Sequence, residues 1–549
     1  MAFAARYTQA MMEEYVKKGQ WKLVSWPEVW DENAQKFPNS EAVVDSKTRL
    51  TWAQAKQWID RFALGLLEMG FKKDDVVVIQ LPNSVELALM RLACEKAGVL
   101  CAPVLRTLRN KDMEYILGFT GAKGVVIPLE FRGFNYLDMI NEIRPKLPNL
   151  KHVFIAGDTV PEGCVSVKSM RDKPLEKKYP EGHLRKYTYD PREVSWISHT
   201  SGSTGFPKFV QIPTAARRSL CEGQVQVLRL TQKDVIGVLS PATGGPNIIT
   251  YWAAALVGAK LAMMEHFEAE EAMKLIQKEK ITVAGLVPTM LAGLLRHPNR
   301  TKYDLSSMRA WYCAAGTPPF QLVKEMEDAI GAKVVQAYGA VDFGSATNAT
   351  LDDPIEVRVL TAGKPVNGAR LKLVDDDGKE VRQGEVGEVW GTGPAGVGGY
   401  FKDEKATWES WTKDNWYRTG DLGKINEAGN LVIVGRKKEM IKRGGQNVYP
   451  IEIEKLLLTH PKVLDIAVVG MPDPEMVEKA CAYVVPKAGQ KFTFDDMSDF
   501  LKEKGLAPFK IPERLEILEK MPMLAADQKI DKKVLKADII EKLKAEGKA

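Results

Sequence analysis

The sequence TSGSTGFPK occupies residues 200–208 and gathers hydroxyl side chains, glycines and one lysine into nine positions. Glycines let backbone N–H groups crowd around an anion, hydroxyl groups add donors, and Lys208 supplies a positive charge. Residues 194–198, just before it, alternate like a β-strand. Because ligands of α/β folds collect where loops leave a sheet, the pattern predicts a phosphate-binding loop. Pro207 before Lys208 rules out a Walker A motif, and a flexible loop without a ligand is the alternative.

Strand and helix patterns alternate on both sides of this loop. Apolar runs suited to strands occur at residues 76–79, 99–104, 124–127, 281–287, 309–313 and 333–336, with helical patterns between them. Such alternation is typical of parallel sheets covered by helices. The sequence therefore predicts an α/β fold with two parallel sheets in a large N-terminal domain.

The pattern changes twice toward the end of the chain. Between about residues 345 and 434, short β-type runs are divided by Asp-Gly and Asn-Glu-Ala-Gly turns, which predicts a small, β-barrel-like subdomain. The last part of the chain mixes strands and helices and predicts a smaller α+β domain. We expect a boundary between residues 1–436 and 437–549, in a short charged segment around Lys438.

The composition argues against several other classes of protein. A chain of 549 residues can form several cores, and a net charge of +6 with scattered lysines does not predict a nucleic-acid surface. The six cysteines form no Cys-x-x-Cys pair, so neither a disulfide framework nor a zinc site is expected. Residues 248–264 are apolar but interrupted by Lys260, and we interpret them as a buried helix rather than a membrane span. With no signal-peptide pattern near Met1, we expect a cytoplasmic protein.

Four further motifs follow the loop at long intervals. They read AGTP at residues 315–318, QAYGAVD at 336–342, YRTGD at 417–421 and MPMLAADQKIDKK at 521–533. Their types and order, together with the opening loop, resemble the adenylate-forming enzymes, the superfamily of acyl-CoA synthetases, peptide-synthetase adenylation domains and beetle luciferases. The resemblance covers most of the chain. It implies that ATP, Mg²⁺ and coenzyme A are used to convert a small carboxylate into a thioester.

The resemblance also implies which residues bind the nucleotide. Residues of the opening loop would hold the β- and γ-phosphates of ATP, the AGTP turn and the tyrosine motif would contact adenine, and a carboxylate and a guanidinium would clamp the ribose. On this reading the ATP- and AMP-binding residues are Thr200, Ser201, Gly202, Ser203, Thr204, Gly205, Lys208, Ala315, Gly316, Thr317, Tyr338, Gly339, Asp421 and Arg436.

The same resemblance implies the catalytic and mobile parts. The implied catalytic residues are Lys529, Asp342 and Lys208. Lys529 would bridge the substrate carboxylate and the α-phosphate, Asp342 would bind Mg²⁺, and Lys208 would help to hold the departing pyrophosphate. The C-terminal domain would turn about a hinge at Lys438. After this rotation, residues of the next strand would line the tunnel for the pantetheine arm of coenzyme A, namely Lys442, Gly444 and Gly445.

Four positions depart from the family pattern. Phe209 replaces a glycine after the phosphate loop, Val341 replaces a threonine, and Gln528 replaces the glycine before the catalytic lysine. Asp342 is also one methylene shorter than the usual glutamate. These changes leave a catalytically silent nucleotide-binding protein as an alternative, although Lys529, Asp421 and Arg436 are retained.

The acyl group is predicted from a stretch of small residues. The segment expected beside the acyl group contains Ala242, Thr243, Gly244 and Gly245. Small side chains leave room for a ring and offer few polar groups, which favours an aromatic or alicyclic monocarboxylate such as benzoate or cyclohexanecarboxylate over a hydroxybenzoate. A medium-chain fatty acid and the loading of a carrier protein, which is the less expected acceptor, are the alternatives. Whether the protein is a monomer or a homodimer stays open.

Overall fold

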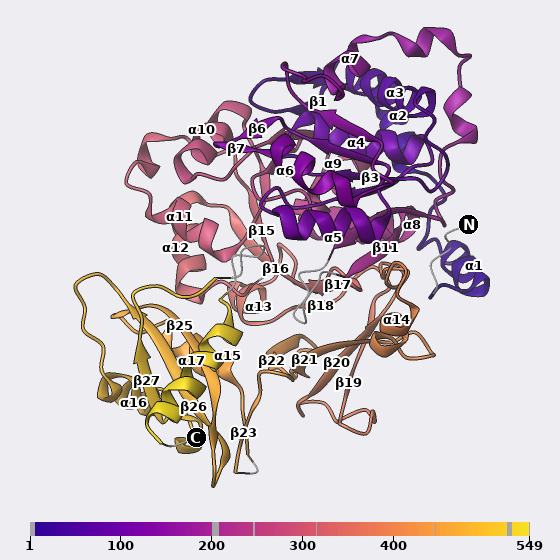
Figure 1. Cartoon of the computed structure of the whole chain (residues 1–549). Coiled ribbons are helices and arrows are strands. Elements are labelled where there is room, and N and C mark those ends of the chain that lie inside the picture. The colour runs from indigo at the N-terminus through magenta and orange to yellow at the C-terminus, as the bar shows by residue number, and fades with distance from the viewer. Residues whose placement is uncertain are drawn as a thin grey trace.

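The computed structural model describes residues 6–199, 208–244, 247–314, 316–444, 446–523 and 530–547, and the side chains of residues 248, 249, 345 and 346 lie outside this description. The described chain forms a large α/β part, a small antiparallel sheet and a C-terminal α+β part (Figure 1). This arrangement confirms the predicted fold class.

The first large sheet has seven strands in the order β11-β10-β4-β3-β5-β8-β9. Its inner strands are short, buried and parallel, as the continuous apolar runs predict. Only β11 runs antiparallel, against β10. The bounds are β3 (Val76–Ile79), β4 (Leu100–Pro103), β5 (Gly124–Ile127), β8 (His152–Ile155), β9 (Val165–Ser166), β10 (Val194–His199) and β11 (Phe209–Pro213).

The second large sheet has nine strands in the order β18-β17-β16-β15-β14-β12-β13-β1-β2. Its central strands β12 to β16 are parallel. The bounds are β1 (Glu41–Val44), β2 (Arg49–Thr51), β12 (Val235–Val238), β13 (Lys260–Met263), β14 (Val283–Leu286), β15 (Ala310–Cys313), β16 (Lys333–Ala340), β17 (Gly344–Asn348) and β18 (Lys364–Pro365).

The apolar stretch 248–264 is not one buried helix, and that interpretation was wrong over its second half. Helix α9 (Asn247–Leu256) ends two residues before Gly258, whose φ of +69° is a left-handed conformation that favours glycine. The chain then enters β13 at Lys260. Periodicity could not separate the two elements because both are buried and apolar.

Buried helices lie close to both large sheets. Helix α4 follows β3 of the first sheet, and its residues are buried apart from Glu86, which is partly buried. It packs against α3, while α9 packs against α8, and the cluster includes the buried rings of Trp26, Trp196 and Trp252. Other helices occupy more exposed positions. The bounds are α1 (Gln9–Lys17), α2 (Trp26–Lys36), α3 (Trp52–Glu68), α4 (Val85–Lys96), α5 (Asn110–Thr120), α6 (Tyr136–Ile143), α7 (Val167–Asp172), α8 (Thr214–Leu228), α10 (Ala269–Glu279), α11 (Pro288–Arg296), α12 (Phe320–Ile330) and α13 (Ile355–Leu360).

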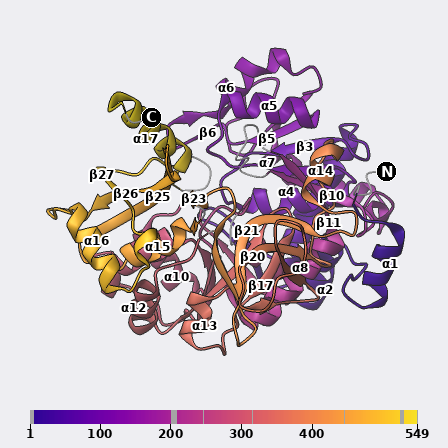
Figure 2. The ribbon, with the colours of Figure 1, turned by 90° about the horizontal axis from the view of Figure 1, so that it is seen from below.

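Two smaller sheets follow in the sequence. Strands β19 (Arg370–Val374), β20 (Gly387–Thr392), β21 (Tyr417–Ile425) and β22 (Leu431–Arg436) form an antiparallel meander, with α14 (Glu404–Ser410) in the connection between β20 and β21. The C-terminal unit lies beside the rest of the molecule in both views (Figures 1 and 2). Its elements are β23 (Ile441–Arg443), β24 (Gln446–Val448), α15 (Pro450–Leu457), β25 (Val463–Asp473), β26 (Val477–Pro486), α16 (Phe494–Glu503), β27 (Arg514–Ile517) and α17 (Lys532–Ala545).

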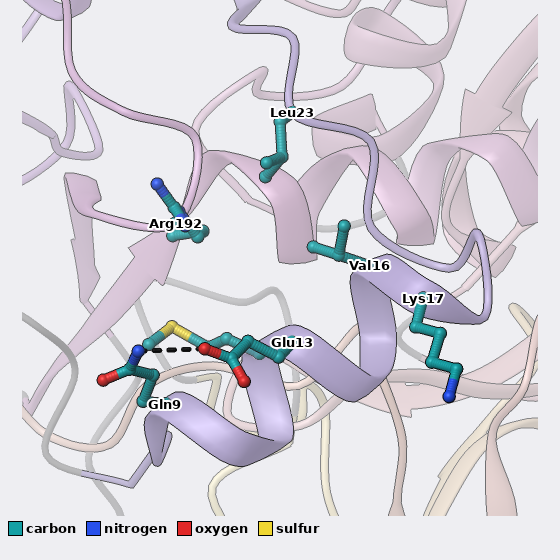
Figure 3. A pocket seen from close by; sticks show the side chains of 7 residues that line it. Gln9, Glu13, Val16, Lys17, Leu23 and Arg192 are labelled. Atoms are coloured by element: carbon teal, nitrogen blue, oxygen red, sulfur yellow. Dashed lines mark hydrogen bonds between the residues drawn. The ribbon is translucent and has the colours of Figure 1, made fainter.

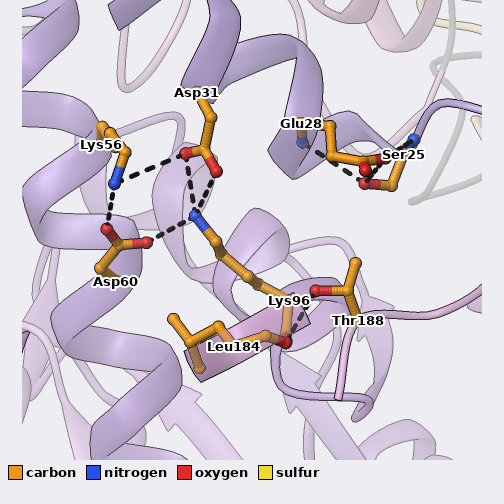
Figure 4. Close-up of polar contacts among 8 residues, drawn as sticks. All are labelled: Ser25, Glu28, Asp31, Lys56, Asp60, Lys96, Leu184 and Thr188. Carbon is orange, nitrogen blue, oxygen red and sulfur yellow. Dashed lines mark hydrogen bonds and ion pairs between the residues drawn. The ribbon is translucent and has the colours of Figure 1, made fainter. Parts of the chain in front are cut away.

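A buried group of charges joins the helices near the N-terminus (Figure 4). The ammonium of Lys96, with a side chain only 8% exposed, lies 2.8 Å from Asp31 and 2.5 Å from Asp60. Lys56 also contacts both carboxylates, at 3.9 Å from Asp31 and 2.5 Å from Asp60. Burial raises the pKa of Asp31 in spite of these lysines. Each of these buried charges on α2, α3 and α4 is therefore stabilised by the opposite charges on its neighbouring helices.

We expect Lys96→Met to lower the free energy of unfolding by about 3 kcal/mol, because the substitution leaves two poorly solvated carboxylates with one lysine between them. Urea unfolding followed by far-UV circular dichroism measures this change. Lys36→Met is the matched control, since Lys36 is 61% exposed and its contact with Glu32 is a surface pair on one helix. Equal effects of the two substitutions would contradict the assigned role of Lys96.

Candidate active site

The best-defined part of the candidate site is the carboxylate of Asp421. Asp421 on β21 pairs in register with Arg436 on β22, and the guanidinium Nε lies 2.7 Å from Oδ1. The hydroxyl of Tyr338, at the end of β16, donates to Oδ2 at 2.7 Å. Burial, together with this carboxylate, raises the pKa of Tyr338 well above its usual value, so the hydroxyl stays protonated. Two residues from different strands, Tyr338 and Arg436, thus orient the carboxylate.

A break in the β-sheet presents Asp421 to this site. The pairing of β20 with β21 shifts its register between Glu388 and Trp390, and Gly420 has a φ of +69°. The Thr419 hydroxyl donates to the Val389 carbonyl at 2.6 Å and accepts the N–H of Asp421 at 3.0 Å. The glycine of the YRTGD motif is therefore required for its backbone conformation.

The predicted adenine-contacting residues are partly brought together. Thr317 follows β15, and its hydroxyl accepts a hydrogen bond of 2.9 Å from Gln336 on the neighbouring strand β16. Gly316 and Gly339 are exposed. Their exposure is compatible with the adenine contact that the resemblance implies, and that contact stays a prediction.

Lys208 and Asp342 meet through a tyrosine that the sequence reasoning missed. The ammonium of Lys208 lies 4.7 Å from the ring centroid of Tyr400, and the hydroxyls of Tyr400 and Tyr417 lie near the carboxyl of Asp342. Burial raises the pKa of Asp342, while these hydroxyls and Lys208 oppose the rise. The only feature of the sequence that marks Tyr400 is its position directly after the glycine-rich run that begins at Gly393.

Asp342 fits a magnesium site in which the protein supplies one ligand. Within the described ranges, His, Cys, Asp and Glu form no group of three or more that could enclose a metal ion. Mg²⁺ commonly binds through one or two carboxylates and completes its shell with phosphates and water. A single carboxylate near Lys208 matches that donor set.

Phe209, the first departure from the family pattern, is part of the core. Its ring is 1% exposed and stacks on Phe119 at a centroid distance of 5.8 Å. Its carbonyl accepts the N–H of Phe401 at 2.7 Å. The residue therefore anchors the chain directly after Lys208 and beside Tyr400.

The predicted hinge and tunnel residues lie on and after the turn that follows β22. Lys438 is exposed in this turn, and Lys442 is exposed on β23. Gly444 has a φ of +53°, and its N–H donates to the Met476 carbonyl at 2.8 Å. A Cβ at Gly444 would lie 2.6 Å from the sulfur of Met476, so a larger residue requires Met476 to move.

The predicted acyl segment is held by residues of the first sheet and its helix. The N–H of Ala242 donates to Asn83 at 2.8 Å, and its carbonyl accepts from Arg91 at 3.1 Å. Thr243 lines a cavity of about 290 Å³ whose other walls are mixed: apolar side chains such as Leu81, Leu239 and Phe267 alternate with the polar or charged Arg106, Glu265 and His266. Among the described atoms, none would lie within 4 Å of a Cβ on Gly244. Asn83 and Arg91 were not anticipated, because nothing in their local sequence reveals a contact across the two sheets.

The structure does not describe several of the predicted site residues. The residues Thr200, Ser201, Gly202, Ser203, Thr204, Gly205, Gly245, Ala315 and Lys529 lie outside the described residues, and their roles stay predictions. Another cavity, of about 220 Å³, lies between α1 and Arg192, and none of its lining residues belongs to the predicted site (Figure 3).

Two family models match this chain, one over the large N-terminal part and one over the C-terminal part. A model described as "AMP-binding enzyme" matches residues 30–401, and one described as "AMP-binding enzyme C-terminal domain" matches residues 452–527. The chain is 29% identical to a 2,3-dihydroxybenzoate-AMP ligase of Bacillus subtilis, with 97% of each chain covered. It is also 29% identical to a medium-chain fatty-acid–CoA ligase of Escherichia coli, with 99% of this chain and 95% of that protein covered.

A solved structure gives the same result. The structure of an anthranilate CoA ligase in complex with anthranoyl-AMP matches with a TM-score of 0.85 and 25% identity, covering 95% of this chain and 98% of that one. The chain therefore belongs to the AMP-binding enzyme family, within the adenylate-forming acyl- and aryl-acid ligases that its motifs resemble. In the described part of the chain, no helix combines the length and apolar character needed to cross a membrane.

We expect Asp421→Asn to weaken AMP binding about 10- to 100-fold, because the ribose would lose hydrogen bonds to a charged acceptor. Isothermal titration calorimetry with AMP measures the dissociation constant, and thermal melting checks the fold. Asp377→Asn, in an exposed turn of the same small sheet, is the control with unchanged affinity. An Asp421→Asn protein that binds AMP within twofold of the unsubstituted protein would show that the carboxylate does not hold the ribose.

Proposed function

We propose that this protein is an ATP-dependent carboxylate–CoA ligase that forms an acyl-AMP and then an acyl-CoA thioester. The observation that carries the proposal is the carboxylate of Asp421, oriented by Tyr338 and Arg436 within an AMP-binding fold. Lys208 and Asp342 supply charges of both signs near each other, as a site for ATP phosphates and a cation requires.

In the first step, a carboxylate oxygen of the substrate bonds to the α-phosphorus of ATP, and the bond from that phosphorus to the β-phosphate oxygen breaks. Pyrophosphate leaves, and the mixed anhydride remains bound. Lys208 stabilises the departing phosphates, and Lys529 bridges the two reacting groups. Mg²⁺ held by Asp342 would neutralise part of the phosphate charge. Asp421 and Arg436 keep the nucleotide in place during the displacement.

In the second step, the thiolate of coenzyme A bonds to the acyl carbon, the bond to the AMP oxygen breaks, and AMP leaves. The thiol must reach the carbon from the side that Lys529 occupied, so we infer a rotation of residues 437–549 about Lys438. The exposed position of Lys438 supports this role. The rotation brings the backbone at Gly444 and Gly445 to the tunnel for the pantetheine arm.

The proposed substrate is an aromatic or alicyclic monocarboxylate. Thr243 faces a cavity with apolar walls at Leu81, Leu239 and Phe267 and charged or polar ones at Arg106, Glu265 and His266, and Gly244 leaves its surroundings open. One similar protein is named for the aryl acid anthranilate and another for medium-chain fatty acids, while a third is named for 2,3-dihydroxybenzoate, a hydroxybenzoate of the class that the proposal disfavours. A medium-chain acid therefore remains the alternative substrate, and a carrier protein the alternative acceptor. The two proposed steps use residues of one chain and are the same for a monomer and for a homodimer.

We expect benzoate and cyclohexanecarboxylate to support ATP–pyrophosphate exchange more strongly than hydroxybenzoates or octanoate, because the acyl segment is small and apolar. Exchange of labelled pyrophosphate across this panel tests the acyl group, and mass spectrometry with coenzyme A or a phosphopantetheinyl carrier protein tests the acceptor. Strongest exchange with octanoate would replace the proposed substrate. Absence of exchange with every acid would refute the ligase assignment.

We expect Lys438→Pro to leave acyl-AMP formation within about twofold and to slow thioester formation at least about tenfold, because proline fixes φ at the turning residue. Single-turnover assays of the two half-reactions measure this separation. Lys438→Ala, which keeps the backbone free, is the control and should affect both steps little. Equal slowing of both steps by the proline would place the hinge elsewhere.

A further inference from the structure

The carboxylate of Glu388 joins two segments that the proposed function assigns to different tasks. Glu388 on β20 has a side chain only 11% exposed. Its Oε1 accepts the N–H of Gly420 at 3.3 Å, and its Oε2 lies 3.1 Å from the ammonium of Lys437. Gly420 directly precedes Asp421, and Lys437 directly precedes Lys438. One side chain therefore connects the neighbour of the nucleotide-binding carboxylate with the neighbour of the hinge.

A backbone hydrogen bond closes the same connection. The N–H of Lys437 donates to the carbonyl of Gly420 at 2.8 Å. Both backbone polar groups of Gly420 are thus engaged at this junction, the N–H by Glu388 and the carbonyl by Lys437. Since Gly420 adopts the left-handed conformation that turns Asp421 toward Tyr338, the junction also supports that geometry.

The chain is tied to the other domain immediately after Lys438. The carboxylate of Glu439 lies 2.9 Å from the ammonium of Lys532 at the start of α17, and that ammonium also lies 2.8 Å from Glu454 on α15. Burial lowers the pKa of Lys532, but Glu454 and Glu439 raise it to a net value above normal. The side chain of Lys437 is thus bound to the small sheet and that of Glu439 to the C-terminal domain, while the N–H of Glu439 donates to the Arg436 carbonyl at 3.0 Å across Lys438.

We propose that Glu388 is a positioning residue that confines the domain rotation to Lys438 and keeps that rotation from disturbing Asp421. The proposal rests on the two-step ligase function and its hinge. Without the contact between Glu388 and Lys437, rotational freedom extends into Lys437, and the C-terminal domain samples more orientations that do not favour reaction. The loss falls on the step that requires the rotated domain. Loss of the contact to Gly420 instead loosens the nucleotide site.

Two substitutions at Glu388 separate these contacts. Glu388→Gln keeps an oxygen for the Gly420 N–H but removes the charge that holds Lys437, so we expect thioester formation to slow roughly five- to twentyfold while acyl-AMP formation and the KM for ATP stay within about twofold. Glu388→Ala removes both contacts, so the KM for ATP should also rise at least about fivefold. Single-turnover assays of each half-reaction, with thermal melting to confirm folding, give these values.

Two further variants serve as controls. Asp376→Asn removes the other contact of Lys437, at 2.9 Å, but Asp376 is 92% exposed and does not contact Gly420, so both half-reactions should change little. Lys437→Met should reproduce Glu388→Gln, and the double variant should be no slower than either single one, because both lose the same contact.

The outcomes distinguish the inference from the function beneath it. If the unsubstituted protein makes acyl-AMP and acyl-CoA but Glu388→Gln slows both steps equally or neither, the positioning role is wrong and the ligase function stands. Additive effects of Glu388→Gln and Lys437→Met would likewise overturn the coupling. If the unsubstituted protein makes no acyl-AMP with any acid of the panel, the ligase function and the inference both fail.

Discussion

The antiparallel register of β21 on β22 sets Asp421 directly opposite Arg436, and the candidate nucleotide site depends on that register. Side chains of a strand alternate between its two faces, so a slip of one residue would turn Asp421 away from both Arg436 and Tyr338. The local break at Gly420 supplies the remaining adjustment. Strand β22 ends at Arg436, so the proposed hinge residue Lys438 follows the candidate nucleotide site by two residues.

A second pairing brings the phosphate-side residues together. The segment around Tyr400 runs beside β11, with the N–H of Gln211 donating to the Gly399 carbonyl at 2.9 Å and the N–H of Phe401 donating to the Phe209 carbonyl at 2.7 Å. Lys208 immediately precedes β11, so this pairing places its ammonium over the ring of Tyr400. The buried ring of Phe209 packs on Phe119 and so fixes this paired segment to the core. A bulky residue at this family glycine position therefore has a structural role at the fixed end of the loop.

The sequence predicted the fold well because its strands are continuous apolar runs and its helices are periodic. It failed at residues 248–264, where a buried helix and a buried strand share the same composition. Within the candidate site, the structure brings together Asp421 and Tyr338, which two separate motifs single out, while their roles toward the nucleotide stay predictions. Tyr400, Asn83 and Arg91 were not predicted, because their importance comes from contacts between distant segments that no local pattern encodes. The identity of the acyl group was thinly predicted for the same reason, since Ala242 is positioned by residues about 150 positions earlier.

The charged contacts on the two sides of Lys438 differ from the pairing of Asp421 in what they can contribute. Lys437 and Glu439 are 39% and 42% exposed, and ion pairs of such exposure contribute only about 0–1 kcal/mol each. They are therefore too weak to lock the two domains in one orientation. The two contacts nevertheless act on different parts of the chain. One attaches the side chain of Lys437 to the small sheet, the other attaches that of Glu439 to the C-terminal domain, and Lys438 lies between the two attachments. Weak ties on both sides of one residue allow a domain to rotate while limiting where the rotation occurs.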